Sequence, residues 1–308
     1  MFLTLGTTPT VQRTMTFERV RPGAVLRALD VHDFASGKSI NVARVLHTLG
    51  RQVRCLGLVG GERGEMIRRE LDQVGIGHAF VDVPPQTRLC VTVLDKHARA
   101  ATEFIEEPTA VDEHAGTKLI ETLARGATDG SALLLSGSLV GGLGDDFYGK
   151  CLAAAGGVTS ILDGRGAALL AALPHRPTVV KLNVEEIGLT FERPMESRSA
   201  LRAAMLEVCA LGAQWCIVTR GSGGAAVTDG ENFWDVGTAR IDTVSPVGSG
   251  DAFAAGLAVR MLGGDDVPTA CRFAAACGAA NAACPDAGHL DPDLVDRLVD
   301  EVVVRAAG

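Results

Sequence analysis

The stretch from Val247 to Gly256, VGSGDAFAAG, decides how this chain is read. Gly248 and Gly250 free the backbone to turn so that successive N–H groups can point at one anion. Asp251 follows at once, and the apolar run from Ala252 to Leu262 predicts a helix. Unpaired amides and the helix dipole both favour negative charge at such a helix start, so the stretch predicts a phosphate site.

Asp251 has two interpretations in this setting. A carboxylate repels a phosphate that it borders, so it is more useful there as a base than as a binding group. The turn then predicts phosphoryl transfer, with Asp251 as the base and the amides of Gly248, Ser249 and Gly250 as the anion site. The alternative is an ordinary Gly-Ser-Gly-Asp turn followed by an Asp that only caps the helix. The stretch alone favours neither.

Outward from this turn, short strands alternate with helices. Strands are expected at residues 2–6, 54–59, 132–135, 158–163, 178–181 and 215–219, and helices at 40–49, 65–74, 111–123, 145–155, 166–172, 184–189, 197–211, 250–262, 267–284 and 291–306. The alternation predicts an α/β fold with a mainly parallel central sheet. Two strand-rich pieces, about 8–34 and 86–107, break the rhythm and predict a small β-lid over that sheet. We expect one domain across residues 1–308.

Polar residues follow several of the predicted strands. Ser136-Gly137-Ser138, Asn183 and Thr219 each come directly after an apolar strand. In a parallel sheet, chemistry gathers beyond the carboxyl ends of the strands, so these residues and the Gly248 turn should meet. This convergence favours the catalytic interpretation of the turn.

Residues 221–226, GSGGAA, match one form of the dinucleotide-binding fingerprint, and Asp242 lies at a fitting distance. The following residues, AVTDGE, read as a strand and a tight turn. A helix N-terminus for a pyrophosphate is therefore not expected, which argues against an oxidoreductase.

Composition narrows the function classes. The net charge of -8 and the lack of a Lys/Arg-rich run argue against nucleic acid as a partner. The eight cysteines contain no C-x-x-C pair, which favours reduced thiols and a cytoplasmic protein. No apolar run reaches the ~18 residues of a membrane span, and the first residues lack the features of a signal peptide.

Taken together, the motifs resemble the phosphofructokinase-B group of ribokinase-like carbohydrate kinases, over about residues 4–290. Residues 36–44, SGKSINVAR, are similar to the first family signature and Val247–Gly256 to the second. Between them stand, in the expected order, Ser136-Gly137-Ser138-Leu139, Lys181 to Glu186, and Thr219-Arg220-Gly221. The form with Lys38 is most like the hexose-phosphate kinases, which include 1-phosphofructokinase and tagatose-6-phosphate kinase. The resemblance implies a three-layer ribokinase-like sandwich with a β-lid.

The resemblance also implies roles. Asp251 would deprotonate a sugar hydroxyl as it attacks the γ-phosphate of ATP, and the amides of residues 248–250 would stabilise the transferring group. Asn183 and Glu186 would organise Mg²⁺, chiefly through water. The residues implied at the nucleotide are Lys181, Asn183, Thr219, Gly221, Gly224 and Asn281. Those implied at the phosphorylated sugar are Gln12, Gly37, Lys38, Asn41, Arg88 and Ser138, with Arg27 reaching across from a second subunit of a homodimer formed through the β-lid.

Several of these residues also have plain structural interpretations. Lys38 and Arg27 could be solvated surface charges, and Arg88 an edge-strand charge. Asn183 could only cap the next helix, and Glu186 could only complement its dipole.

The sugar pocket departs from the family pattern. Gln12 stands where the family has an Asp for sugar hydroxyls, and Ser36 and Ser39 replace glycines. The sequence therefore predicts an ATP- and Mg²⁺-dependent kinase of a fructose or tagatose phosphate. A kinase of an unphosphorylated sugar or nucleoside, or a binding protein that has lost catalysis, stays open as an alternative.

Overall fold

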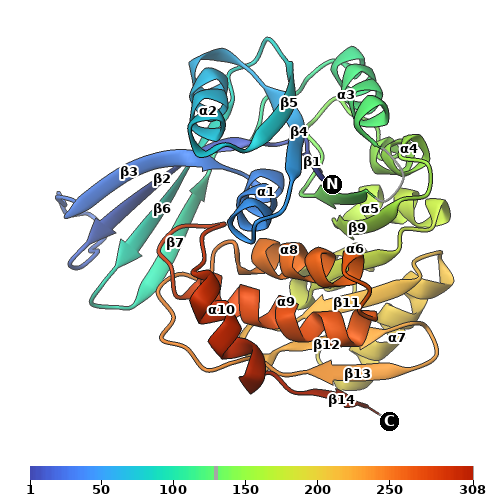
Figure 1. The fold of residues 1–308 in the computed structure, drawn as a ribbon. Helices are drawn as coiled ribbons and strands as arrows, with labels where there is room; N and C mark the ends of the chain where they lie inside the picture. Colours follow the sequence, from blue (N-terminus) through green and yellow to red (C-terminus); the bar gives the residue numbers. More distant parts are fainter. Residues whose placement is uncertain (128–130, 308) are drawn as a thin grey trace.

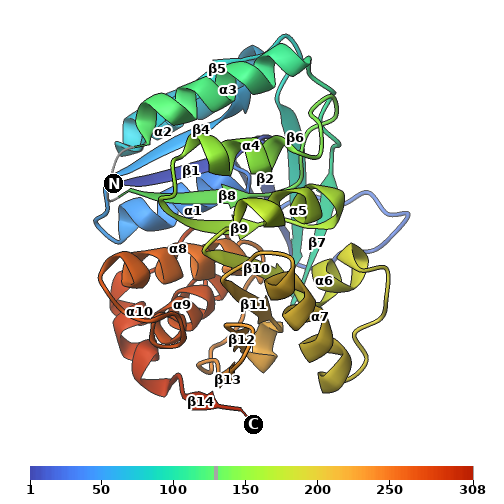
Figure 2. The same cartoon turned by 90° about the vertical axis from the view of Figure 1, so that its right-hand side faces the viewer.

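The computed structural model describes residues 1–127 and 131–307, and a large twisted sheet runs through it (Figures 1 and 2). Within these residues the sheet has ten strands in the order β14-β13-β12-β11-β10-β9-β8-β1-β4-β5. Neighbouring strands are parallel from β11 to β5, whereas β12, β13 and β14 are antiparallel. The strands are β1 (Phe2–Gly6), β4 (Val53–Val59), β5 (Gly77–Asp82), β8 (Ala132–Ser136), β9 (Thr159–Asp163), β10 (Val179–Asn183), β11 (Trp215–Thr219), β12 (Ala225–Thr228), β13 (Phe233–Val236) and β14 (Val304–Ala306). The mainly parallel sheet is as the sequence predicts.

Helices cover both faces of this sheet. One face packs against α1 (Lys38–Thr48), α2 (Gly61–Val74), α8 (Ser249–Leu262), α9 (Val267–Ala282) and α10 (Pro292–Leu298). The other packs against α3 (Glu113–Gly126), α4 (Phe147–Ala154), α5 (Gly166–Ala172), α6 (Val184–Thr190) and α7 (Arg198–Ala210). The two hydrophobic cores lie on either side of the sheet, as the fully buried run of β8 illustrates: Leu133 and Leu135 face one core and Leu134 the other.

Short 3₁₀ turns follow two of these helices and one strand. They are η1 (Leu173–His175), η2 (Gly221–Gly223) and η3 (Val299–Glu301).

The last predicted helix, 291–306, is wrong in its second half. The helix begins after Asp291, which accepts a hydrogen bond from the N–H of Asp293, and it ends at Leu298. The run Val302-Val303-Val304 is β-branched and favours an extended chain, and β14 pairs with β13 there. The sequence reading also omits β5, an edge strand whose residues are only partly buried and therefore show no clear alternation.

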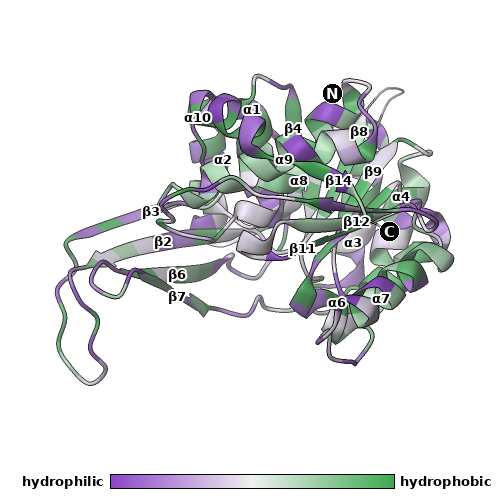
Figure 3. Cartoon of the chain, turned by 90° about the horizontal axis from the view of Figure 1, so that it is seen from below, coloured by the Kyte–Doolittle hydropathy of each residue, from purple (hydrophilic) through white to green (hydrophobic). Residues whose placement is uncertain are grey.

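A second sheet of four strands, in the order β3-β2-β6-β7, projects from the body (Figure 3). Its strands are β2 (Thr10–Phe17), β3 (Asp30–Ser36), β6 (Arg88–Asp95) and β7 (Ala100–Ile105). They coincide with the two strand-rich pieces that the sequence singles out, except that β3 runs two residues further, to Ser36, and β6 and β7 form an antiparallel hairpin. One end of this sheet meets the carboxyl edge of the large sheet, because β3 leads directly into α1.

None of the helices in the described part of the chain is both long and apolar enough to cross a membrane.

Candidate active site

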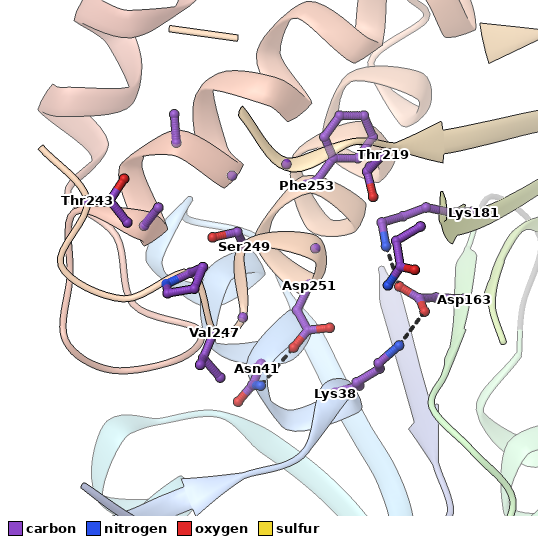
Figure 4. Close-up of a pocket in the computed structure, with 18 of the residues that line it drawn as sticks. Lys38, Asn41, Asp163, Lys181, Thr219, Thr243, Val247, Ser249, Asp251 and Phe253 are labelled. Carbon is purple, nitrogen blue, oxygen red and sulfur yellow. Dashed lines mark hydrogen bonds and ion pairs between the residues drawn. The ribbon is translucent and has the colours of Figure 1, made fainter. Parts of the chain in front are cut away.

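A cavity of about 1050 Å³ opens where the carboxyl ends of β9, β10 and β11 meet the start of α8 and the projecting sheet. Figure 4 shows its centre, with side chains from α1, the large sheet and α8 pointing into a common space. The predicted site residues that line it are Gln12, Gly37, Lys38, Asn41, Arg88, Lys181, Asn183, Glu186, Thr219, Gly221, Gly224, Gly248, Ser249, Gly250 and Asp251. Sequence elements more than 200 residues apart therefore share one cavity.

The Gly248 turn opens α8 as predicted. Gly248 is the N-cap in the left-handed region (φ 82°), and a Cβ there would lie 2.8 Å from Ala287, so only glycine fits. In the part of the chain that the structure describes, the N–H groups of Gly248 and Gly250 have no acceptor, and the buried Ser249 hydroxyl has no partner. Three unpaired donors at a helix N-terminus are an arrangement suited to bind an anion.

Asp251 does not cap the helix. Its carboxylate instead accepts a hydrogen bond of 2.8 Å from the Asn41 amide, and Asn41 accepts one of 2.9 Å from the Ser36 hydroxyl. Asp251 is 6% exposed, and burial raises its pKa to about 6, although Lys38 opposes the shift. A carboxyl group that ionises near neutral pH is suited to accept a proton.

Asp163, which the sequence analysis missed, lies between two lysines (Figure 4). Its carboxylate accepts hydrogen bonds from Lys38 (2.7 Å) and Lys181 (2.6 Å). Burial alone would raise its pKa, but the two ammonium groups hold the pKa well below its usual range. Asp163 ends a buried strand at the edge where the other site residues lie, so the same edge argument could have found it.

The Lys38 ammonium contacts Glu186 as well, at 3.1 Å. Burial opposes its charge, but the carboxylates of Asp163, Glu186 and Asp251 outweigh that and raise the pKa of Lys38. The interpretation of Lys38 as a solvated surface charge is therefore wrong: it is an ion-paired member of the cavity wall.

Asn183 and Glu186 form a capping box at the start of α6. The Glu186 N–H donates to Asn183 Oδ1 and the Asn183 N–H to Glu186 Oε2, both at 2.8 Å. Asn183 therefore does cap the helix, as the structural interpretation says, and both residues of the capping box also line the cavity. Since the remaining oxygen, Glu186 Oε1, takes a hydrogen bond from Lys38, this pair does not form a direct cage for Mg²⁺. Among the described residues, no cluster of three His, Cys, Asp or Glu side chains is arranged for a metal ion.

On the far side of the Gly248 turn, the cavity is lined by Thr219, Gly221 and Gly224 and by residues 238–241 and 243. Gly224 has φ 78°, and a Cβ there would lie 2.0 Å from the carbonyl oxygen of Val236. The chain from Gly221 forms a 3₁₀ turn and then β12. No helix follows the GSGGAA segment, as the argument against a dinucleotide site expects.

The projecting sheet supplies the opposite wall. Gln12 is buried and donates from Nε2 to the Thr92 hydroxyl at 2.9 Å. Arg88 donates to the carbonyl oxygens of Thr8 (3.1 Å) and Glu106 (3.4 Å). The sequence analysis missed Thr10, Cys90, Glu103 and Ile105 on this wall.

Three predicted residues do not line the cavity. Arg27 is exposed in the turn between β2 and β3, and Ser138 is exposed beyond β8. Asn281 is fully buried, and its amide nitrogen donates to the carbonyl oxygens of Asp286 and His289. Their positions in the sequence relative to the family motifs implied that these residues lie at the site. In the structure two of them are exposed outside the cavity, and the third is buried behind it.

Residues 6–294 match the model of the pfkB family of carbohydrate kinases. The chain belongs to this family. It is a sugar kinase, and kinase membership implies ATP as the phosphoryl donor.

Solved structures of similar shape agree with this membership. Phosphofructokinase-2 from Escherichia coli in complex with potassium is 25% identical, with a TM-score of 0.90 over 97% of this kinase and 98% of that chain. The same E. coli enzyme has been solved with fructose-6-phosphate (24% identity, TM-score 0.88, 97% and 98% covered). A possible 1-phosphofructokinase from Thermotoga maritima is 19% identical, with a TM-score of 0.91 over 100% and 99% of the two chains. Arabidopsis thaliana ribokinase, complexed with ribose and ATP, is 21% identical, with a TM-score of 0.73 over 97% and 98%. The ribokinase-like fold that the resemblance implies is confirmed.

Proposed function

We propose that this sugar kinase transfers the γ-phosphoryl group of ATP to a hydroxyl of a phosphorylated ketohexose, a fructose or tagatose phosphate. The observation that carries the proposal is the buried Asp251 carboxylate beside the unpaired N–H groups of Gly248 and Gly250. A base and an anion site within one helical turn meet the two needs of phosphoryl transfer.

In this mechanism Asp251 accepts the proton of the attacking hydroxyl, while Asn41 holds its carboxylate in place through the 2.8 Å hydrogen bond. The amides of Gly248 and Gly250 and the Ser249 hydroxyl stabilise charge on the phosphoryl oxygens. Lys38 and Lys181, fixed by Asp163, supply positive charge to the same region.

Mg²⁺ would supply charge neutralisation on the phosphates of ATP. Asn183 Oδ1 and Glu186 Oε2 accept hydrogen bonds within the capping box, and Glu186 Oε1 accepts one from Lys38. Because these oxygens already have partners, the two residues suit a hydrated ion carried by the nucleotide. Asn183, Lys181, Thr219, Gly221 and Gly224 would border that nucleotide.

The phosphate of the acceptor is assigned to Arg88, with Gln12, Gly37 and Asn41 contacting the sugar. The relative that bears the name phosphofructokinase-2 and has been solved with fructose-6-phosphate supports this choice of acceptor. Gln12 donates one of its two Nε2 hydrogens to Thr92, which leaves the other hydrogen and the carbonyl oxygen for the sugar. The oxygen is an acceptor like the carboxylate of the family pattern.

We further propose a homodimer formed through the projecting sheet. Large apolar side chains are exposed on it and on the adjoining turn: Val25 (90%), Leu29 (56%), Val31 (47%), Phe104 (59%) and Ile105 (52%). Arg27 belongs to the same segment and would reach the acceptor of a second copy. The eight free thiols suit a reducing compartment, so the cytoplasm is our proposed location.

One observation favours a second candidate, a kinase of an unphosphorylated sugar. Of the three cations expected to hold the acceptor phosphate, Lys38 is ion-paired with Asp163 and Glu186, and Arg27 does not line the cavity. Arg88 then stands on the acceptor wall with Glu103, a carboxylate that has no hydrogen bond or ion pair among the described residues.

The test is ATP turnover over a matched panel: fructose 1-phosphate, fructose 6-phosphate and tagatose 6-phosphate, against fructose, tagatose, ribose and adenosine. Turnover of a ketohexose phosphate with at least a tenfold higher kcat/KM than its parent sugar is expected. Turnover only of unphosphorylated compounds would replace the first candidate with the second. Ligand-dependent thermal stabilisation without any turnover would indicate a binding protein.

A further inference from the structure

The segment 285–289, which follows α9, lies between the anion-binding turn and the projecting sheet. A Cβ at Gly248 would lie 2.8 Å from Ala287, and one at Gly288 would lie 2.7 Å from the Cα of Asn41. The backbone of this segment is therefore packed against both the N-cap of α8 and the residue that orients Asp251. A shift of the segment would be transmitted to both.

The same segment is attached to the projecting sheet by the Asp286 carboxylate. His32 of β3 places Nε2 at 2.8 Å and 2.9 Å from the two Asp286 oxygens, and Thr14 of β2 donates its hydroxyl to Oδ1 at 3.1 Å. His32 and Thr14 are register partners, so they stand on one face of the sheet, side by side. Thr14 is buried, and the His32 side chain is 38% exposed.

Two further contacts give the segment a defined shape. Asn281 binds the carbonyl oxygens of Asp286 and His289 through one amide nitrogen. The rings of Phe34 and His289 meet edge to face at 5.8 Å, and His32 stacks on Phe34. The segment is thus fixed internally, and Asp286 is its charged attachment to the sheet.

We propose that His32 and Asp286 form a charge-dependent latch that couples the projecting sheet to the Gly248 turn and Asn41. With His32 charged, Asp286 receives a charge-assisted hydrogen bond and segment 285–289 is held against the turn. With His32 neutral, that bond weakens and the turn loses order. His32 and Asp286 are positioning residues, since neither lines the cavity.

The surroundings of His32 make the latch sensitive to pH above the ordinary pKa of a histidine. Burial alone would lower the pKa of His32, but hydrogen bonds and charges from Asp286 and Asp30 raise it. The Asp33 carboxylate also interacts with the charge of His32, although both oxygens of Asp33 accept hydrogen bonds from Arg13. On the side of the segment, Cys284 and His289 are the titratable groups that respond to Asp286.

The sign follows from the raised pKa. A histidine with a raised pKa stabilises its contact fully below its ordinary value of about 6.5. The contribution is lost as the pH rises through the raised pKa. The latch is therefore closed below about pH 6.5 and opens as the pH rises through the raised pKa of His32.

The importance of the latch for phosphoryl transfer rests on the proposed function of the Gly248 turn, but its existence is tested without a substrate. Amide hydrogen exchange is measured by mass spectrometry on the full chain at pH 6 and pH 9, with rates corrected for the intrinsic effect of pH. The segments followed are 248–251 and 285–289, and strand β8 is the internal reference. The variants are Asp286→Asn, His32→Asn and His32→Arg. Asp30→Asn is the matched control, because Asp30 also contacts His32 (3.3 Å) but, in the described part of the chain, forms no hydrogen bond or ion pair with the segment.

In the natural chain, corrected exchange in both segments should be roughly tenfold faster at pH 9 than at pH 6, the effect of losing one charge-assisted hydrogen bond. Asp286→Asn and His32→Asn should show the faster exchange at both pH values. His32→Arg keeps a permanent charge and should show slow exchange at both. Asp30→Asn should keep the difference between the two pH values, with the transition between them moved to lower pH, because Asp30 contributes to the raised pKa of His32.

Equal corrected exchange at the two pH values in the natural chain would overturn the latch. So would a change confined to segment 285–289, because the coupling to the Gly248 turn would then be absent. If the latch behaves as expected but Asp251→Asn leaves turnover intact, the proposed function of the turn fails and the latch stands. If the acceptor panel succeeds but exchange does not respond to His32, the reverse holds.

Discussion

The transfer centre (Lys38, Asp163, Lys181, Gly248 and Asp251) and the acceptor wall (Gln12, Arg88 and Glu103) face each other across one cavity and are built differently. In the transfer centre each charged side chain has a partner, and Asp163, Lys181 and Asp251 are 1%, 3% and 6% exposed. On the acceptor wall, Gln12 is likewise buried and hydrogen-bonded, but Arg88 contacts only backbone carbonyls among the residues that the structure describes. The groups that we propose for phosphoryl transfer therefore have their charges paired by the fold, while the charge of Arg88 is left for a substrate to pair.

The largest effect is expected at the centre of this arrangement. Asp251→Asn removes the proton acceptor but keeps the size of the side chain and the space for ATP. The value of kcat should fall by about 10²–10⁴-fold, the usual contribution of a general base, with the affinity for ATP changed little. Steady-state kinetics together with calorimetric titration of ATP measure both quantities. Retained turnover would remove Asp251 as the base.

The natural kinase should also show the ionisation of Asp251 in its pH dependence. Since burial raises the Asp251 pKa to about 6, kcat/KM should rise with pH through about 6 and then level off before any loss of the latch. A rising limb centred near 4 would mean that the base is a different, solvated carboxylate.

Asp163→Asn tests whether the transfer centre depends on its own ion pairs. The change leaves two ammonium groups facing each other near a buried amide, and breaking a buried pair in this way costs about 3–5 kcal/mol of unfolding free energy. Urea denaturation at pH 7 measures it. The matched control is Asp33→Asn, which breaks the exposed pair with Arg13 and should cost less than about 1 kcal/mol. Equal losses of unfolding free energy in the two variants would show that the buried ion pairs of the transfer centre contribute no more than an exposed pair.

Asp251→Asn should at the same time stabilise the free kinase. A carboxyl group whose pKa rises from 3.8 to about 6 on folding disfavours the folded state once it ionises. At pH 7 this penalty is up to roughly 3 kcal/mol, since each pKa unit is worth about 1.4 kcal/mol. The gain from Asp251→Asn should therefore be largest above pH 6 and vanish below pH 4. Thermal unfolding across pH 3.5–8 measures it, and a variant that is less stable at pH 7 would show that the Asn41 hydrogen bond dominates.

The contrast between the two regions also explains what the sequence could predict. The Gly248 turn, the strand ends and the helix starts are local features, so glycine at a positive φ and polar residues after apolar strands are visible in the chain itself. Asp163 also ends a buried strand, so the same argument could have found it, but its pairing with Lys181 required knowing that β9 lies next to β10. Placing Glu103 at the cavity requires knowing how β7 pairs with β6 and β6 with β2. The exposure of Arg27 and Ser138 can be seen only in the folded chain. At the C-terminus, β14 forms only because β13 offers an edge, which a helical pattern in residues 291–306 cannot reveal.

The smallest effect distinguishes the acceptors. If Arg88 binds the phosphate of the substrate, Arg88→Gln should raise the KM for a ketohexose phosphate by roughly tenfold, the worth of one charge-assisted hydrogen bond, and leave kcat and the KM for ATP nearly unchanged. Arg88→Lys, which keeps the charge but not the fork of donors, should fall between the two. Arg27→Gln tests whether Arg27 of a second subunit also binds the acceptor. It should match Arg88→Gln at kinase concentrations where the chain is dimeric and have no effect where it is monomeric. An Arg88→Gln variant with an unchanged KM would show that Arg88 does not bind a phosphate of the acceptor, and the acceptor wall, with Gln12 and the Glu103 carboxylate, would then favour an unphosphorylated sugar.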